Sequence, residues 1–271
     1  MTELVGVSMW VRGIGVCGSE LNTWPNTRAI LRGESRMPVQ AAPIPLCSKL
    51  PAAERRRASK VVNLAMGAGT EAVASAGLDA ATLPTVFATS SADGENCHSI
   101  CAALASPDPS DHLLSPTRFH NSVTNAAAGY WAIAMAAMAP STALTVYDGS
   151  FSAALLEACA ALSTGTPDIL IAVFDAPYPD PLCRERPVRS SLGVALALSA
   201  QAGTGRLARL RLGLTDGAAG RMAVDGLEAM RCNSPPARGL PLLECFARGG
   251  SATVRLEYLD DVRLAIDVEP A

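Results

Sequence analysis

Short apolar runs alternate with helical patterns along the first two thirds of the chain. The runs that predict strands are Leu4–Val11, Thr85–Thr89, Ala143–Tyr147 and Asp168–Phe174. The segments that predict helices are Ala52–Gly77, Glu95–Leu104, Asn121–Met138 and Ser150–Ser163. Apolar strands that alternate with helices at this spacing predict an α/β protein, with a mixed sheet covered by helices on both faces.

Both ends of this pattern are less regular. Near the start, three glycines are expected to turn the chain out of its first strand into a helical stretch: Gly13, Gly15 and Gly18. After the proline-rich loop that follows Asp175, strands are predicted over Leu192–Leu198, Leu207–Leu212, Ala252–Leu259 and Val262–Val268, the last two as a hairpin. The region Gly217–Gly250 is predicted to be helical with breaks.

Composition places the chain among globular proteins. Hydrophobic residues make up 49% of the 271 positions and charged residues 17%, and the mean hydropathy is +0.23, which excludes a disordered chain. Only two of the 22 basic residues are lysines and the net charge is −3, so a nucleic-acid partner is not expected. The segment Met1–Val16 carries Glu3 and Arg12 and does not resemble a secretory signal, which predicts a cytoplasmic protein.

One long segment without acids, lysine or arginine raises the question of a membrane span. Phe119–Tyr147 is long enough to cross a bilayer. It is nevertheless interrupted at Pro140 and contains His120, Asn121 and Asn125. These features favour a buried helix followed by a buried strand.

The cysteines do not suggest a disulfide framework or a metal centre. Eight of them are scattered through a chain that is too long to need cross-links, so free thiols are expected. Only Cys97, His98 and Cys101 cluster, and no second Cys/His pair completes the four ligands of a zinc site. No metal and no cofactor is therefore predicted.

Several motifs together resemble the N-terminal half of a β-ketoacyl synthase, the condensing enzyme of fatty-acid and polyketide assembly. The motifs are Gly13-Ile14-Gly15-Val16, Trp24, Leu31-Arg32-Gly33, Ala58-Ser59-Lys60, Glu71-Ala72, Ala76-Gly77-Leu78, Ser115-Pro116, Asn125, Ala128-Gly129 and Pro140-Ser141. The resemblance covers roughly residues 1–200 and is strongest over 115–148. It implies a thiolase-like half fold, truncated relative to a full synthase, in which 1–271 form a single domain and 201–271 are divergent C-terminal strands and helices.

The resemblance places Asp148 where the family has its catalytic cysteine. A carboxylate cannot replace a thiolate in holding a growing chain as a thioester. An aspartate before Gly149-Ser150 at the start of a helix is expected to act as an N-cap. The alternative is an acid that decarboxylates or polarises a bound malonyl group.

A second departure from the family lies in the remaining catalytic groups. In the family that this chain resembles, two catalytic histidines and a supporting lysine follow the nucleophile. Here the last histidine is His120 and the last lysine is Lys60. No residue after 148 can therefore supply an imidazole to stabilise a developing enolate or oxyanion, and no catalytic residue is assigned.

A lost nucleophile, lost histidines and a kept interface segment resemble chain-length factors, the inactive partners of ketoacyl synthases. The short length and the strings Phe119–Val123 and Ala128–Trp131 are similar to truncated partner subunits of aryl-polyene and xanthomonadin-type pigment clusters. This resemblance implies that the chain forms a heterodimer with an active ketoacyl synthase. The acyl carrier protein would then be only an indirect partner of this chain. The resemblance to the thiolase-type fold also implies that the apolar segment Asn121–Met138 lies beside a two-fold axis. Without a partner this segment would be a large exposed apolar patch, which soluble monomers rarely tolerate.

The resemblance also assigns interface residues. The residues expected near the floor of the partner's acyl tunnel are Arg118, Phe119, Asn121 and Ser122, and Asn125 belongs to the same interface segment. Tyr130 and Trp131 have two interpretations: they anchor the interface, or they fill the core of their own subunit.

Two other classes of function stay open. One is an independent acyl-thioester enzyme, a decarboxylase or hydrolase that uses Asp148 or Ser150. The sequence around Ser150 is similar to a serine elbow but lacks Gly-x-Ser-x-Gly, and the histidines that could serve as its base are His98, His112 and His120. The other class is a homodimeric acyl-binding module. The basic runs Arg55–Arg57 and Arg184, Arg186 and Arg189 are either contacts for an acidic carrier protein or solvated faces.

Overall fold

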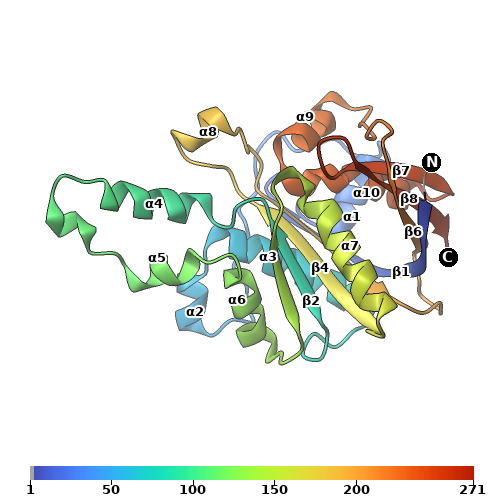
Figure 1. Cartoon of the computed structure of the whole chain (residues 1–271), viewed down its shortest axis with the longest axis horizontal. Coiled ribbons are helices and arrows are strands. Elements are labelled where there is room, and N and C mark those ends of the chain that lie inside the picture. Colours follow the sequence, from blue (N-terminus) through green and yellow to red (C-terminus); the bar gives the residue numbers. More distant parts are fainter. Residues whose placement is uncertain (1–2) are drawn as a thin grey trace.

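The computed structural model describes residues 3–271, which form one eight-stranded sheet in the order β3-β2-β4-β5-β1-β6-β8-β7 (Figure 1). The strands are β1 (Glu3–Gly18), β2 (Thr85–Thr89), β3 (Ser141–Thr145), β4 (Asp168–Asp175), β5 (Leu192–Ser199), β6 (Ala208–Thr215), β7 (Ala252–Glu257) and β8 (Arg263–Pro270). Strand β2 runs parallel to β3 and β4, whereas the other pairs in the sheet are antiparallel.

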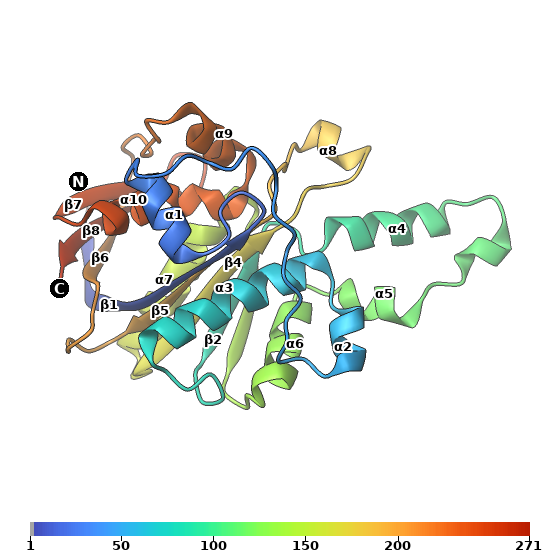
Figure 2. The same cartoon turned by 180° about the vertical axis from the view of Figure 1, so that it is seen from behind.

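Helices lie on both sides of this sheet, which confirms the predicted α/β class (Figures 1 and 2). They are α1 (Trp24–Leu31), α2 (Ala52–Arg57), α3 (Lys60–Ala76), α4 (Gly94–Leu104), α5 (Pro116–Asn121), α6 (Ala126–Met135), α7 (Ser150–Ser163), α8 (Leu182–Glu185), α9 (Asp225–Asn233) and α10 (Leu240–Arg248). One apolar core joins the sheet to α3 and α6, and a second joins it to α7 and α10. Strands β6, β7 and β8 continue the same sheet beyond residue 200.

The expected turn at Gly13, Gly15 and Gly18 is wrong, because β1 continues through all three glycines. Helix α3 crosses β1 so closely that a Cβ atom at Gly13 would collide with the carbonyl oxygen of Ala72, and one at Gly15 with that of Ala68. These two glycines therefore permit close contact between a helix and a strand, whereas the sequence pattern had indicated a turn.

Two long predicted helices are each broken in the structure. The segment 52–77 divides into α2 and α3 at Ala58 and Ser59, whose backbones are extended. The side-chain amide of Asn63 donates to the carbonyl oxygen of Ser59 at 3.0 Å and stabilises this break. Of the predicted segment 121–138, only residues 126–135 form a helix, α6, whereas Asn121 is the last residue of α5. Between the two helices, the Ser122 hydroxyl donates to the carbonyl oxygen of Phe119 at 2.8 Å.

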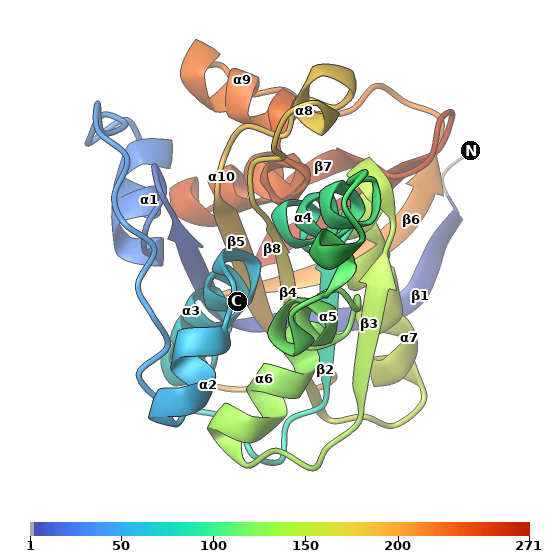
Figure 3. The same ribbon diagram turned by 90° about the vertical axis from the view of Figure 1, so that its left-hand side faces the viewer.

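The expectation of a buried helix and a buried strand over 119–147 is also wrong in part. Strand β3 is an edge strand whose residues are exposed or half-buried. Helix α6 buries one side in the core and exposes Ile133 on the other. Ahead of them, α4, the short helix Pro109–His112 and α5 form a projecting arm, residues 94–121 (Figures 1 to 3). Among the helices of residues 3–271, none is long and apolar enough to cross a membrane.

The close crossing of α3 over β1 gives a stability prediction. Replacing Gly15 with alanine forces the two elements apart, so we expect a loss of about 1–3 kcal/mol in the free energy of unfolding. Gly129→Ala in α6 is the matched control, since a Cβ atom there meets nothing within 4 Å, and a gain of about 0.5–1 kcal/mol is expected. Urea unfolding followed by circular dichroism measures both. Equal stability of the two variants would contradict the assigned contact.

Candidate functional site at the strand-to-helix elbow

The elbow, residues 146–150, connects the end of β3 to the start of α7. Tyr147 has a φ of 50°, which is unusual for a residue other than glycine. At Gly149 a Cβ atom would collide with the carbonyl oxygen of Tyr258. The fully buried Ser150 hydroxyl lies 2.9 Å from the carbonyl oxygen of Thr89 and 2.8 Å from that of Tyr147. Ser150 is therefore a structural tether of the elbow and is not exposed to a substrate.

Asp148 lies in this elbow and its carboxylate is paired with two arginines. Arg186 Nη2 is 3.0 Å from Asp148 Oδ1, and Arg238 Nη2 is 3.6 Å from Asp148 Oδ2. The guanidinium carbon of Arg186 also lies 3.2 Å from the centre of the Tyr147 ring, in a cation–π contact. The expected capping role of Asp148 is wrong, because the N-cap of α7 is Gly149 and no side chain caps that helix.

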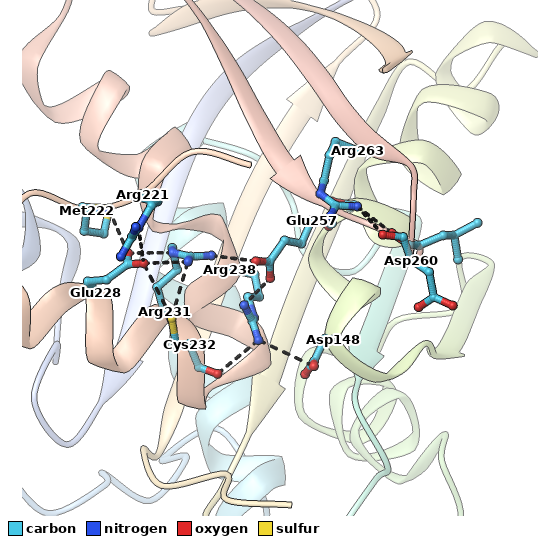
Figure 4. A network of polar contacts seen from close by, with 12 residues as sticks. Asp148, Arg221, Met222, Glu228, Arg231, Cys232, Arg238, Glu257, Asp260 and Arg263 are labelled. Carbon is cyan, nitrogen blue, oxygen red and sulfur yellow. Dashed lines mark hydrogen bonds and ion pairs between the residues drawn. The ribbon is translucent and has the colours of Figure 1, made fainter. Parts of the chain in front are cut away.

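Asp148 is the end of a chain of charged side chains that extends into the C-terminal region (Figure 4). Arg238 pairs with Glu257 at the end of β7, and Glu257 pairs with Arg231 of α9 at 3.0 Å. Arg231 in turn pairs with Glu228 at 2.7 Å and holds the pKa of that carboxyl well below its usual range. This network connects the elbow to the region Gly217–Gly250, for which the sequence had suggested no function.

The electrostatics of the elbow do not suit catalysis by Asp148. Burial raises the pKa of the Asp148 carboxyl, and the charge of Arg238 opposes that shift. Burial lowers the pKa of Arg186 to about 10, so this guanidinium stays charged at neutral pH. Both oxygens of the Asp148 carboxylate face guanidinium groups, and this pairing leaves no free carboxylate oxygen to act as a nucleophile. The chain's histidines lie on the arm: His98 in α4, His112 in the short helix and His120 in α5.

A second carboxylate, Asp175, is completely buried next to the elbow. It accepts hydrogen bonds from the hydroxyls of Thr89 at 2.9 Å and Ser90 at 2.8 Å and from the backbone N–H of Ser90. The Ser90 hydroxyl also contacts the Tyr178 hydroxyl at 2.7 Å. Burial raises the pKa of Asp175 to about 7, and the negative charge of Asp148 adds to this effect. Sequence reasoning missed Asp175, although an acid that ends an apolar strand was a signal.

The residues expected at a partner interface are divided between the surface and the core. Phe119 is 66% exposed on α5, and Arg118 and Asn125 are also exposed. Ser122 is half-buried. Asn121 is buried, where it accepts a hydrogen bond from the Tyr130 hydroxyl at 3.1 Å and donates to the carbonyl oxygen of Arg57 at 2.8 Å.

Tyr130 and Trp131 belong to the core of this chain. They are 1% and 2% exposed, and the Trp131 ring lies 5.9 Å from the ring of Phe87. Gly69 of α3 makes room for Trp131, since a Cβ atom there would touch the indole. The expectation that the two rings directly anchor an interface is therefore wrong. The structure supports the other interpretation, in which they fill the core of their own subunit.

No metal centre is evident in the described part of the chain. Cys97, His98 and Cys101 share helix α4, but no group of three or more His, Cys, Asp or Glu side chains among residues 3–271 is arranged to hold a metal ion. All eight cysteines are unpaired in the structure.

Comparisons with known proteins agree on the family and the fold. The sequence model of the β-ketoacyl synthase N-terminal domain matches residues 25–252, whereas a comparison with curated proteins found no match. Among solved structures, a chain of the ketosynthase ApeO in complex with its chain length factor ApeC from Xenorhabdus doucetiae is 20% identical, with a TM-score of 0.71 and coverage of 96% of this chain and 99% of that one. The ishigamide ketosynthase/chain length factor is 12% identical, with a TM-score of 0.73 and coverage of 97% and 99%. These likenesses confirm the thiolase-like fold.

The buried Asp175 predicts a pH dependence of stability. Its pKa is higher in the folded chain than in the unfolded chain, so between pH 4 and 7 the folded state binds more protons and its stability falls as the pH rises. Asp175→Asn should flatten this part of the curve. The free energy of unfolding in urea, measured at intervals over that range, tests this. A slope unchanged from that of the wild type would show that another group titrates.

Proposed function

Because the chain belongs to the β-ketoacyl synthase N-terminal domain family, we propose that it is a non-catalytic, chain-length-factor-like subunit that pairs with an active β-ketoacyl synthase. The observation that carries this proposal is the elbow, where Asp148 is held by Arg186 and Arg238. An elbow that presents a paired carboxylate has no nucleophile for thioester exchange. The chain would then shape the acyl pocket of its partner without reacting with the acyl group.

The surroundings of the elbow support this assignment. Decarboxylative condensation needs groups that stabilise a developing enolate or oxyanion, and imidazoles commonly do so. The histidines are confined to the arm, and the side chains that face Asp148 are arginines already paired with acids. The two alternative nucleophiles have little support. Ser150 is fully buried and hydrogen-bonded to backbone carbonyl oxygens, and the Asp148 carboxylate is paired with two guanidinium groups.

The surface offers a region suited to a protein partner. Large apolar side chains are exposed along the arm, on α6 and just after it: Leu104, Leu113, Phe119, Val123, Ile133 and Met138. The edge of β3 that faces away from β2 is unpaired within the described sheet, and exposed edge strands are sites of association. An apolar surface of this extent beside an open edge favours burial against another subunit.

Within this surface, Phe119 is the residue best placed to reach a partner's acyl tunnel. Its side chain is exposed on α5, a helix of the arm that extends beyond the main body of the chain (Figures 1 and 2). Arg118, Ser122 and Asn125 lie on or beside the same helix. Tyr130 and Trp131 contribute indirectly, since they fix α6 against the core. The solved ketosynthase and chain length factor complexes of similar fold support a synthase as the partner.

Several arginines of the basic segments are engaged in contacts within this chain. Arg55 donates to the carbonyl oxygens of Ser48 and Leu50, and Arg57 pairs with Glu54. Arg184 pairs with Asp180. We therefore propose that the synthase binds the acyl carrier protein directly. This chain would be associated with the carrier protein only through the synthase. Eight unpaired cysteines support the cytoplasm as its compartment.

Co-expression with a β-ketoacyl synthase encoded beside this chain tests the pairing. We expect a 1:1 complex by size-exclusion chromatography with mass determination. Leu113→Asp on the arm should weaken the complex at least tenfold, because it places a charge on the apolar surface. Val39→Asp, at a fully exposed residue outside that surface, is the control. A monomer or homodimer that ignores the synthase would refute the proposal and favour an acyl-binding module.

The role of Phe119 gives a separate prediction. Phe119→Ala removes the exposed ring, so the reconstituted pair should release products of altered length, with the complex intact. Leu207→Ala is the matched control, because Leu207 is similarly exposed and precedes β6, at the end of the sheet away from the arm (Figure 1). Mass spectrometry of the released acyl products measures the effect. Identical product distributions from Phe119→Ala and wild type would exclude Phe119 from the tunnel.

A further inference from the structure

We propose that the elbow is a carboxylate-binding site whose resident ligand is the chain's own Asp148. The site consists of the guanidinium groups of Arg186 and Arg238 and the N-terminus of α7. Because Asp148 occupies it, the carboxylate of a substrate or metabolite is kept out. The inference concerns the elbow alone, so it stands whether or not the chain pairs with a synthase.

The two arginines converge on one carboxylate from separate segments of the chain. Arg186 follows α8, and Arg238 lies in the short helix Pro235–Gly239. Each side chain is only 12% exposed, and each places a guanidinium nitrogen within 3.6 Å of a different oxygen of Asp148. Their buried Nε atoms have no hydrogen-bond partner within residues 3–271. Two nearly buried cations around one carboxylate form a site that favours an anion strongly.

Both arginines are held in position by contacts other than Asp148. The guanidinium of Arg186 stacks on the Tyr147 ring at 3.2 Å. Arg238 pairs with Glu257 and donates to the carbonyl oxygen of Cys232 at 3.1 Å. The site is therefore organised in advance and should keep its shape when the Asp148 side chain is removed.

The start of α7 adds to the positive potential at the elbow. This helix has 14 residues and no side chain caps its first N–H groups, so its N-terminus carries a partial positive charge next to Asp148. A hollow of about 110 Å³ is lined by Tyr147, Asp148 and Arg186 and opens to solvent. A small external carboxylate can therefore reach the site from solution once the internal carboxylate is gone.

Rescue of an Asp148 variant by an added carboxylate tests this inference. Asp148→Ala leaves the two arginines without their ligand, and formate replaces the lost carboxylate group. In sodium formate at about 100 mM we expect the Tm of the full-length variant to exceed its value in sodium chloride of equal ionic strength by about 2–4 °C. Acetamide, which is neutral and similar in shape to acetate, should have no effect. The wild type should show no difference between the two salts.

The matched control is Asp168→Ala, which breaks another partly exposed ion pair. Arg12 lies 3.0 Å from Asp168. Arg206 is close enough to sense the charge of Asp168, but among residues 3–271 only Arg12 forms an ion pair with it, whereas Asp148 has two such partners. This variant should not respond to formate. The double variant Asp148→Ala with Arg238→Gln should lose the response of the single variant. Equal responses of Asp148→Ala, Asp168→Ala and wild type would overturn the inference, as would no response of Asp148→Ala.

A second substitution and a second measurement keep the test decisive if Asp148→Ala folds poorly. If Asp148→Ala does not accumulate as folded protein, Asp148→Ser is compared in the same salts. If both are unfolded, formate must restore their helical circular-dichroism signal where acetamide does not. Failure of formate to restore it would overturn the inference. None of these measurements involves a partner, so a failure here is distinct from a failure of the pairing proposal.

Discussion

The ion pairs of Asp148 with Arg186 and Arg238 are the interaction on which the interpretation of this chain depends. They occupy the turn between β3 and α7 and connect it to the C-terminal region through Glu257 and Arg231. The arginines of this network are nearly buried, whereas its acids are partly exposed, so removing one acid leaves a nearly buried guanidinium without that partner, which is destabilising. The network therefore connects the C-terminal region to the elbow and makes the elbow a structural junction.

The rest of the fold is arranged around that junction. The parallel strands β2, β3 and β4 end near it, and Asp175 at the end of β4 accepts a hydrogen bond from Ser90, the first residue after β2. The arm, which follows β2 along the chain, carries exposed apolar residues that no described part of the chain covers (Figure 1). The ion pairs occupy the elbow, whereas the apolar residues of the arm and the edge of β3 are exposed. This combination fits a subunit that acts through contact with a partner.

The sequence predicted the parts of the fold that depend on local patterns. Strands β2 and β5 are fully buried, as is β4 after Asp168, and their continuous apolar runs were sufficient to identify them. The course of β1 through Gly13 and Gly15 was not predictable in the same way, because the reason for these glycines is the close crossing of α3. Likewise, an isolated apolar pattern cannot indicate that Trp131 points inward and Ile133 outward, since their neighbours come from distant segments.

The site was predictable only as far as the family resemblance extended. The resemblance placed Asp148 at the elbow, but its partners Arg186 and Arg238 are 38 and 90 residues away along the chain, and no local spacing links them. The sequence favoured a capping role for Asp148 because aspartate often caps helices, whereas the nearby guanidinium groups bind the carboxylate more strongly than backbone N–H groups do. Long-range electrostatics therefore decided what local propensity could not.

The central claim is that the acyl group is carried by the partner and never by this chain. Intact-mass spectrometry of both subunits tests it most directly, after the purified complex has been incubated with an acyl-loaded carrier protein. The account predicts an acyl adduct on the synthase subunit and an unchanged mass for this chain. An acyl adduct on this chain, at Asp148, Ser150 or any cysteine, would contradict it.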